Sequence, residues 1–513
     1  MPKVLEIQPD FSQPAAPLRH SWAGLVNIDQ FKWLSWSVVH EALGMAREEL
    51  GAHTVRAVGM YGFASRVLDK DPRGFRNPEH RKPRSNFSML HTYFDGCIER
   101  GVTPMFTTCF TPDLLAEGDK TVFDKSGNVT PPRCLETWGA FVEESVRRMA
   151  RRYGRARMRS WMFEVWNEPN LEGGFWVGGQ ERWFELWKHS WQAIKRVDPG
   201  FRVGGPSTAR GEWVGELLDF GAAHDCPPDY LITHCYNNDS ASQPLSPFDG
   251  PQEDKANKSP NFLAGVVRGV RALCEEKKFT GEIHWNEWGR SWFPCDEERE
   301  SENEAAFICK SMMEVSGEAD YFAYWCLSDI YNQVGYGRET FHGNYGMLNQ
   351  QNIRKPSYLA HQLLERLGSV RHAAKVDGGS PLLNAAVCGD EDRRQLLVYH
   401  FQAEDTASPG PLEVVLRLPA EMPWHQPKLF RITASENNSP ARWRSAGAET
   451  HLSPGDARRW RDSSALRETA LSEICESVRD GVREVRFSLE GRGVALLEWH
   501  LEAEPEAMVM DGG

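Results

Sequence analysis

The sequence predicts an α/β protein in which a (β/α)8 TIM barrel precedes a C-terminal antiparallel β-sandwich. From about residue 20 to residue 365, short apolar or β-branched runs alternate with longer helix-like stretches, as in a barrel of parallel strands. After Leu367 this alternation stops, and strand-like pieces are separated by Pro, Gly, Ser and Asn. The length of 513 residues also favours more than one domain.

Eight runs are expected to form the barrel strands. In chain order they are Ser21–Asn27, Thr54–Met60, Thr103–Thr108, Ser160–Trp166, Phe201–Gly205, Tyr230–His234, Glu282–Asn286 and Tyr321–Leu327. The amphipathic helices between them include Cys134–Tyr153, Glu181–Val197, Gly211–Ala223 and Asn261–Glu276. Gly173–Gly179 and Asn237–Lys258 are expected to be long loops that follow strands, on the face where the carboxyl ends of the strands meet.

The predicted domain boundary lies at residue 366, with the barrel in residues 18–366 and the sandwich in residues 367–501. The strands expected in the sandwich are Gln395–Phe401, Leu412–Leu418, Leu429–Ala434, Val482–Leu489 and Val494–Leu501. Residues 1–17 are a candidate for a further strand of the sandwich, and residues 502–513 are expected to be a frayed tail. Residues 441–461 are polar and contain Trp, and no structure is predicted for them.

Composition and charge exclude several classes of protein. The net charge is −13 and no basic face is evident, so nucleic acid is not an expected partner. No apolar run is long enough to span a membrane and no secretory leader is visible, so we expect a cytoplasmic protein. The 11 cysteines contain no Cys-x-x-Cys pair, and no His and carboxylate spacing indicates a metal site or a cofactor. The oligomeric state stays open.

The most informative run is residues 161–170, which read Trp-Met-Phe-Glu-Val-Trp-Asn-Glu-Pro-Asn. An apolar, aromatic strand ends there in an amide, the carboxylate of Glu168 and a proline that favours a turn. Aromatic walls desolvate a carboxyl group and raise its pKa. Glu168 is therefore predicted to hold a proton near neutral pH and to donate it.

A second run, residues 282–288, ends in the same style with Glu287 between Asn and Trp. In a parallel barrel the two strand ends lie on one face, so the two carboxylates can meet. Two carboxylates around one bond are the equipment for cleaving a glycosidic linkage. The 19 tryptophans fit a carbohydrate enzyme, although most of them are expected to be core residues.

These runs resemble glycoside hydrolase family 39, which contains β-xylosidases and α-L-iduronidases, and the signal-free chain is most similar to the bacterial β-xylosidases. The resemblance spans roughly residues 50 to 370 and becomes vague in the C-terminal part. It implies retaining hydrolysis of terminal β-D-xylose from xylobiose and short xylo-oligosaccharides, with Glu168 as proton donor and then base and with Glu287 as nucleophile. The segments that carry it are Phe163–Leu171, Arg202–Thr208, Asp229–Tyr236, His284–Gly289, Tyr324–Asp329, Phe341–Leu348 and Arg354–Pro356.

Six further residues are candidates for contacts in the site. Asn167 is expected to donate to the 2-hydroxyl of the sugar, Trp325 to form a stacking floor, and Gln333 to replace an acidic contact. His234 and Tyr236 alternate with Cys235, so both point toward the pocket, and Tyr236 is expected to orient Glu287. Arg56 is expected to hold down the pKa of Glu287. For each of them a purely structural contact is the alternative.

Three departures from the family's pattern leave the sugar open. Asn332-Gln333 stands where an acidic residue is usual, Val58 where a His often follows the Arg, and Phe293 lacks a phenol hydroxyl. An α-L-arabinosidase or mixed pentosidase is therefore an alternative, as are an iduronidase-like enzyme and an endo-acting glycanase. A non-catalytic carbohydrate-binding protein is the alternative from a different class.

Overall fold

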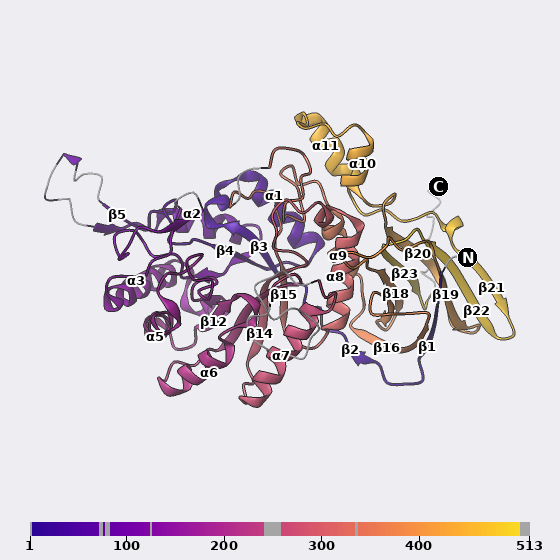
Figure 1. Cartoon of the computed structure of the whole chain (residues 1–513), viewed down its shortest axis with the longest axis horizontal. Helices are drawn as coiled ribbons and strands as arrows, with labels where there is room; N and C mark the ends of the chain where they lie inside the picture. The colour runs from indigo at the N-terminus through magenta and orange to yellow at the C-terminus, as the bar shows by residue number, and fades with distance from the viewer. Residues whose placement is uncertain are drawn as a thin grey trace, which may run out of the picture.

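The computed structural model describes residues 3–70, 75–76, 79, 83–123, 126–240, 258–333 and 337–502. Most of the loop predicted at Asn237–Lys258 and nearly all of the predicted tail lie outside the described residues. The molecule is a mixed α/β protein in which curled parallel sheets with surrounding helices join a large C-terminal region that is mostly sheet (Figure 1).

Two parallel sheets form the N-terminal part. The six-stranded sheet has the order β15-β14-β13-β12-β11-β8, and the three-stranded sheet has the order β3-β4-β7. Their strands are β3 (Leu25–Gln30), β4 (Thr54–Val58), β7 (Thr103–Pro104), β8 (Phe106–Thr107), β11 (Met162–Glu164), β12 (Arg202–Thr208), β13 (Tyr230–Tyr236), β14 (Glu282–Gly289) and β15 (Tyr321–Tyr324).

The two sheets are neighbours at both of their edges. On one side β7 and β8 are consecutive pieces of the third predicted strand, separated by Met105, whose N–H donates to the carbonyl of Val55 at 2.8 Å. On the other side the N–H of Phe322 donates to the carbonyl of Ser21 at 2.6 Å. The strand predicted to end at Leu327 ends at Tyr324, but the N–H of Leu327 still donates to the carbonyl of Asn27 at 2.8 Å.

Helices surround these strands (Figure 1). Helix α5 is typical, because it buries Trp183, Trp187, Ser190 and Ile194 at helical spacing against the sheet. The helices of this part are α1 (Ser37–Glu49), α2 (Ser88–Ile98), α3 (Leu135–Tyr153), α4 (Arg155–Met158), α5 (Gly179–Val197), α6 (Val214–Ala223), α7 (Phe262–Glu276), α8 (Glu302–Glu314) and α9 (Pro356–Glu365), with 3-10 turns at Phe31–Ser35, Ala209–Gly211 and Glu297–Glu300. Two small hairpins pair β5 (Leu68–Lys70) with β6 (Pro83–Ser85) and β9 (Thr121–Val122) with β10 (Gly127–Asn128).

The C-terminal region is one ten-stranded sheet that folds over a shared apolar core. The order is β20-β23-β18-β17-β16-β1-β19-β22-β21, and β2 also pairs with β16. Alternate residues such as Val414, Leu416 and Leu418 point into this core. The strands are β1 (Lys3–Asp10), β2 (Ala16–Pro17), β16 (Val370–Asp377), β17 (Leu383–Gly389), β18 (Arg393–His400), β19 (Leu412–Pro419), β20 (His425–Ile432), β21 (Cys475–Arg479), β22 (Val482–Leu489) and β23 (Gly493–His500).

Two features of this region differ from the prediction. The pairing is not purely antiparallel, because β1 runs parallel to β19 while it pairs antiparallel with β16. The whole N-terminal part separates β1 from β19 in the chain, so no hairpin forces them to run in opposite directions. Residues 441–461, for which nothing was predicted, carry most of helices α10 (Ser439–Ser445) and α11 (Pro454–Ser463), and a 3-10 turn follows at Leu471–Glu473.

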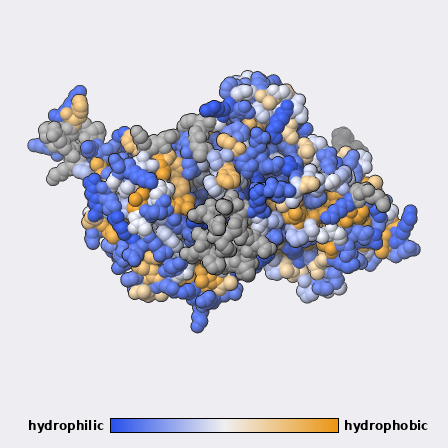
Figure 2. Space-filling model, in the orientation of Figure 1, coloured by the Kyte–Doolittle hydropathy of each residue, from blue (hydrophilic) through white to orange (hydrophobic). Residues whose placement is uncertain are grey.

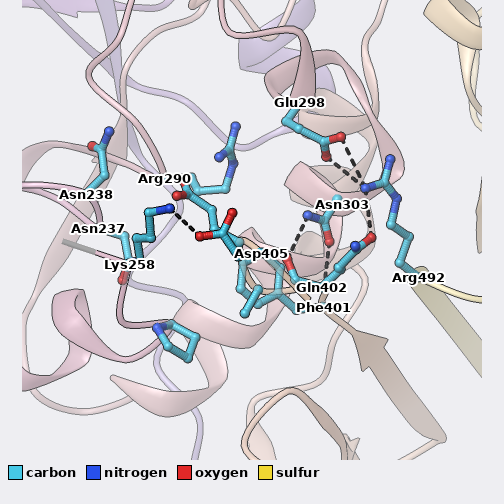
Figure 3. Close-up of a pocket in the computed structure, with 13 residues that line it drawn as sticks. Asn237, Asn238, Lys258, Arg290, Glu298, Asn303, Phe401, Gln402, Asp405 and Arg492 are labelled. Carbon is cyan, nitrogen blue, oxygen red and sulfur yellow. Dashed lines mark hydrogen bonds and ion pairs between the residues drawn. The ribbon is translucent and has the colours of Figure 1, made fainter. Parts of the chain in front are cut away.

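The two parts are joined by polar contacts around a cavity of about 210 Å³ (Figure 3). Arg492 donates to Glu298 at 3.0 Å, and Asn303 and Gln402 exchange hydrogen bonds of 2.8 and 3.0 Å. Lys258 forms an ion pair with Asp405. These contacts tie the start of α8, the segment before it and the segment before α7 to the C-terminal region.

The face of the molecule in Figure 2 is mostly hydrophilic, with hydrophobic residues scattered between charged ones. Among the described residues, no helix combines the length and the apolar character needed to cross a bilayer.

Candidate active site

A cavity of about 520 Å³ opens at the carboxyl ends of the parallel strands. Six residues that the sequence singled out line it, namely Asn167, Glu168, Tyr236, Glu287, Trp325 and Gln333. The other two, Arg56 and His234, are fully buried and reach the site through hydrogen bonds to residues of the wall. The structure therefore brings together all eight predicted site residues.

Glu168 occupies a constrained position in the turn that follows β11, four residues after the end of the strand. Its φ of 44° lies in the left-handed region, which a residue other than glycine adopts only when its surroundings hold it there. Its N–H donates to the carbonyl of Ser207 at 2.8 Å, and its own carbonyl accepts from Leu171 at 3.1 Å. Burial raises the pKa of its carboxyl group to about 7, against the attraction of Arg56 and Arg210.

Glu287, near the end of β14, is held at both carboxylate oxygens. Arg56 donates to Oε2 at 2.9 Å and the Tyr236 hydroxyl donates to Oε1 at 2.8 Å. Burial raises the pKa of Glu287 above its ordinary value, while these two donors act in the opposite direction. Arg56 does lower the pKa of Glu287, as expected. Desolvation raises this pKa by more, so the net shift is upward.

Arg56 is the charge centre beneath the pocket. Besides Glu287, its guanidinium donates to Asn167 at 2.5 Å and to both oxygens of Glu164, at 3.0 and 3.1 Å. Burial disfavours the charged form of the guanidinium, but the carboxylates of Glu164 and Glu287 outweigh this and raise the pKa of Arg56 above its ordinary value. The guanidinium thus stays charged and fixes three acceptors at once.

Glu164 is a buried residue of the site that was not predicted from the sequence. Its carboxylate is fully buried and accepts from Arg56, from Thr107 at 3.0 Å, from Asn286 at 3.1 Å and from Ser207. Burial would raise its pKa, but Arg56 and these donors hold the pKa below the ordinary value. A charged residue inside an otherwise apolar strand is the signal that could have identified it, because such a charge needs a buried partner.

His234 points toward the two carboxylates of the pocket, as expected, but its ring is fully buried and does not itself line the cavity. Its Nδ1 is 3.0 Å from Glu168 Oε1, and its Nε2 is 3.4 Å from Arg56. Burial lowers the pKa of His234 to about 4, so the ring is neutral near neutral pH. Since Arg56 can only donate, Nε2 is the acceptor and Nδ1 carries the proton that it donates to Glu168.

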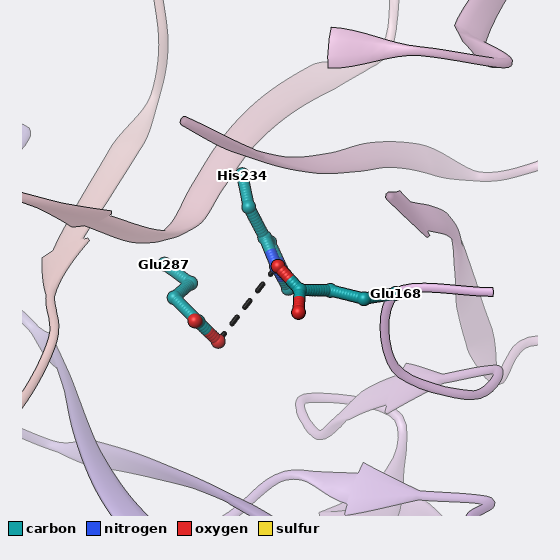
Figure 4. A group of neighbouring side chains, drawn as sticks. All are labelled: Glu168, His234 and Glu287. Carbon is teal, nitrogen blue, oxygen red and sulfur yellow. Dashed lines mark hydrogen bonds and ion pairs between the residues drawn. The ribbon is translucent and has the colours of Figure 1, made fainter. Parts of the chain in front are cut away.

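Glu168, His234 and Glu287 form a compact cluster (Figure 4). One donor atom from each lies within 4.8 Å of the others, a grouping that could hold a metal ion. The sequence predicted no metal site, because these residues come from three strands and share no local spacing. The charge of Arg56, 2.9 Å from Glu287, already balances a carboxylate and would repel a cation, so we assign no metal to the cluster.

The remaining wall is mostly aromatic. Trp325, Tyr331 and Tyr345 form one apolar cluster with Tyr236, and the Tyr331 hydroxyl donates to Gln333. Several lining residues were not predicted, among them Phe123, Leu171, Phe175, Arg210, Asp239 and Trp292. They lie in loops after the strands, whose path in space no local pattern in the sequence reveals.

The family described as Glycosyl hydrolases family 39 matches residues 6–465. A β-xylosidase of Caldicellulosiruptor saccharolyticus is 33% identical over 390 residues, which are 76% of this chain and 77% of that protein. A β-xylosidase of Geobacillus stearothermophilus is 30% identical over 332 residues, 64% of each chain. The crystal structure of a monomeric β-xylosidase from Caulobacter crescentus CB15 aligns with a TM-score of 0.80 and 25% identity, covering 98% of this chain and 100% of that one.

Proposed function

Because the chain belongs to family 39 of the glycosyl hydrolases and is a β-xylosidase-like glycoside hydrolase, we propose that it releases terminal β-D-xylose from xylobiose and short xylo-oligosaccharides with retention of configuration. The observation that carries the proposal is the pair of buried carboxylates, Glu168 and Glu287, in the wall of one sugar-sized cavity. One oxygen of each lies within 4.8 Å of the other. That spacing supports retention, for which the carboxyl groups stand about 5–5.5 Å apart, rather than the 6.5–9.5 Å of inversion.

In the proposed reaction, Glu287 attacks the anomeric carbon while Glu168 gives its proton to the departing oxygen. The glycosidic C–O bond breaks and a covalent ester between the sugar and Glu287 forms. Glu168, now ionised, then takes a proton from water, and the resulting hydroxide equivalent displaces Glu287 from the sugar. Both carboxyl groups return to their starting states.

The contacts of the two carboxylates support this division of roles. Arg56 and Tyr236 donate to Glu287 and favour its charged form, which a nucleophile needs. Burial raises the pKa of Glu168 to about 7, so a large fraction of this carboxyl group still holds a proton near neutral pH. After it loses that proton, Nδ1–H of His234 at 3.0 Å stabilises the carboxylate that must act as base.

Three residues are proposed to bind the sugar directly. Asn167 accepts from Arg56 through Oδ1, which leaves its amide N–H₂ to donate to the 2-hydroxyl. Trp325 is the proposed stacking floor, and Gln333 the proposed partner of a distal hydroxyl. Arg56, His234 and Tyr236 are proposed to position the two carboxylates.

The finer description of the fold is part of the proposal. We infer that the two curled sheets together form one closed (β/α)8 barrel, since hydrogen bonds join both pairs of edges. We place the catalytic domain at residues 18–366 and a β-sandwich domain at residues 367–501, to which residues 1–17 contribute strands.

A second candidate, α-L-arabinosidase, is favoured by one specific observation. Val58 and Gln333 line the cavity where relatives of the proposed family usually carry a His and an acidic residue. An apolar side chain and a neutral amide hold the hydroxyls of a xylose less firmly, so another pentose can compete. A non-catalytic binding protein is disfavoured, because binding requires neither a buried proton donor nor a second carboxylate beside it.

The test combines a substrate panel with the loss of the nucleophile. Among the aryl glycosides of β-xylose, α-arabinofuranose, α-arabinopyranose and β-glucose, the xyloside should have the highest kcat/KM. Glu287→Ala should lose activity by at least about 1,000-fold, since it removes the group that forms the covalent intermediate. Added azide should restore release of the aryl alcohol and give a glycosyl azide of inverted configuration by NMR. Near-normal turnover by this variant would refute the assignment.

A further inference from the structure

We propose that the leaving-group side of this site is built for a hydrophobic aglycone, such as the alcohol of an aryl or arylalkyl β-xyloside, in preference to a second sugar. The inference rests on the proposed role of Glu168 as proton donor. A proton donor faces the oxygen of the leaving group, so residues beside Glu168 line the leaving-group side.

Three apolar side chains line the same cavity as Glu168, namely Leu171 and Phe175 of the loop that follows Glu168, and Phe123. Leu171 is linked directly to Glu168, because its N–H donates to the Glu168 carbonyl at 3.1 Å. Phe175 follows in the same loop, and its ring centroid lies 5.7 Å from that of Phe123. We call these three residues the apolar wall.

The apolar wall is supported from behind and is therefore preformed. Phe110 is fully buried and packs against both of its phenyl rings, at centroid distances of 5.9 Å to Phe123 and 6.5 Å to Phe175. The indole N–H of Trp166 donates to the carbonyl of Phe175 at 2.8 Å and fixes that loop. A rigid wall costs little ordering entropy when a ligand binds.

The chemistry of this wall suits an apolar ligand better than a second pentose. Leu171 and the two phenyl rings offer no hydrogen bond, so sugar hydroxyls turned toward them would lose partners that water supplies. Arg210, a cation in the same cavity wall, is already engaged with Glu212 at 3.0 Å and with Ser240 at 3.4 Å. The cavity of about 520 Å³ also leaves room beyond one pentose.

The two sides of the cavity therefore differ. The side of Glu287 presents the hydroxyl of Tyr236, the amide of Gln333 and the ring of Trp325, which suit a sugar. The loop that follows Glu168 presents the apolar wall, and the charged lining groups that interact with Glu168, Arg210 and Asp239, are already engaged with Glu212 and with the N–H of Tyr236. Binding of an apolar aglycone there adds affinity through burial of its surface, at roughly 25 cal/mol per Å².

The test compares xylobiose with 2-phenylethyl β-D-xyloside, whose alcohol is a poorer leaving group than a sugar hydroxyl. The wild-type kcat/KM should nevertheless be higher for the phenylethyl xyloside. Phe175→Ala should reduce that kcat/KM by about tenfold and change the value for xylobiose less than about twofold, because only one substrate uses the phenyl contact. Leu171→Asn should act in the same direction, and Phe75→Ala, at a side chain 94% exposed, is the matched control.

The outcomes separate this inference from the proposed function. The inference is wrong, and the xylosidase assignment stands, if xylobiose is the better substrate. The same holds if Phe175→Ala and Leu171→Asn lower kcat/KM equally for xylobiose and for the phenylethyl xyloside while the control does not. If neither xyloside is hydrolysed, the proposed function itself fails, and the inference fails with it.

Discussion

Glu168 and Glu287 share one cavity but are surrounded by different charges. Glu287 accepts from a guanidinium and a phenol, whereas Glu168 accepts from a neutral imidazole. A charged hydrogen-bond donor stabilises an ionised carboxylate more strongly than a neutral donor does. The site thus provides two carboxyl groups with different affinities for a proton, which an acid and a nucleophile require.

The alkaline limb of the pH profile should report Glu168. If Glu168 is the proton donor, kcat/KM for xylobiose should fall as pH rises through about 7, because the raised pKa of Glu168 is about 7 and the ionised form has no proton to give. Glu168→Gln should lower kcat/KM for xylobiose by about 100-fold or more but spare activated aryl xylosides, whose leaving groups need no proton. With those aryl substrates the variant should no longer show this limb.

Asp239 provides the matched control for this assignment. Burial raises the pKa of Asp239 to about 7 as well, and its carboxylate lines the same cavity while it accepts from the N–H of Tyr236 at 2.7 Å. Asp239→Asn should keep the alkaline limb. If the alkaline limb disappears in Asp239→Asn and persists in Glu168→Gln, then Asp239 rather than Glu168 is the group that titrates, and the assignment of Glu168 as proton donor is wrong.

At the level of strands, two irregularities build the base of the site. Ser207 is an extra residue between paired positions of β12 and β13, and Asn286 is an extra residue between paired positions of β13 and β14. Both side chains donate to the buried carboxylate of Glu164. The second irregularity also pairs His234 with Glu287. Bulges near active sites commonly redirect side chains in this way.

These bulges explain why the sequence predicted the wall better than its support. The strand ends that carry Glu168 and Glu287 can be predicted from the sequence, because apolar runs precede both residues and a turn-forming proline follows Glu168. The alternation of His234 and Tyr236 predicted one shared direction, and both side chains reach a carboxylate of the site, although only Tyr236 lines the cavity itself. Glu164 escaped prediction because its partners come from strands that only the folded sheet makes neighbours.

The long segment after β15 is held in place by a buried cation. Lys355, directly before α9, lies 2.6 Å from Asp329 and 2.8 Å from Glu300, and all three side chains are fully buried. Asp329 also accepts from the N–H of Gly346 at 2.7 Å. The segment between them supplies Tyr331 and Tyr345 to the cavity wall.

Lys355→Met should therefore destabilise the protein strongly. Removing the cation leaves two buried carboxylates without their shared counter-charge, which costs about 3–5 kcal/mol of the free energy of unfolding. Chemical denaturation followed by fluorescence would measure the loss. Lys375→Met is the matched control, since Lys375 pairs with Asp377 at 2.6 Å on the surface with its side chain 70% exposed, and little change is expected. Equal effects of both substitutions would contradict this account.

At the scale of the whole molecule, the N-terminal part and the C-terminal sheet share apolar surface. Strand β23 has two buried faces. Ala495, Leu497 and Trp499 point into the core of the C-terminal sheet, whereas Val494 and Leu496 belong to the large apolar core of the N-terminal part, which we call the main core. Helix α8, which lies at this junction in Figure 1, is buried at 12 of its 13 residues because it is covered from both sides. The break in periodicity after Leu367 indicated a change of architecture but not this shared core, because each strand's second buried face depends on what packs against it.

The shared core predicts that the proposed catalytic domain cannot be isolated. A fragment of residues 18–366 would expose the face of α8 that β23 covers, together with the contacts of Phe430 and Ile432, which also belong to the main core. Exposed apolar surface of this extent favours aggregation. The fragment should be largely insoluble on expression, and co-expression of residues 367–513 should not restore the full yield, because β1 is missing from the centre of the sheet. A fragment that is soluble, unfolds cooperatively and keeps the full-length kcat/KM would show that the C-terminal sheet is a dispensable attachment.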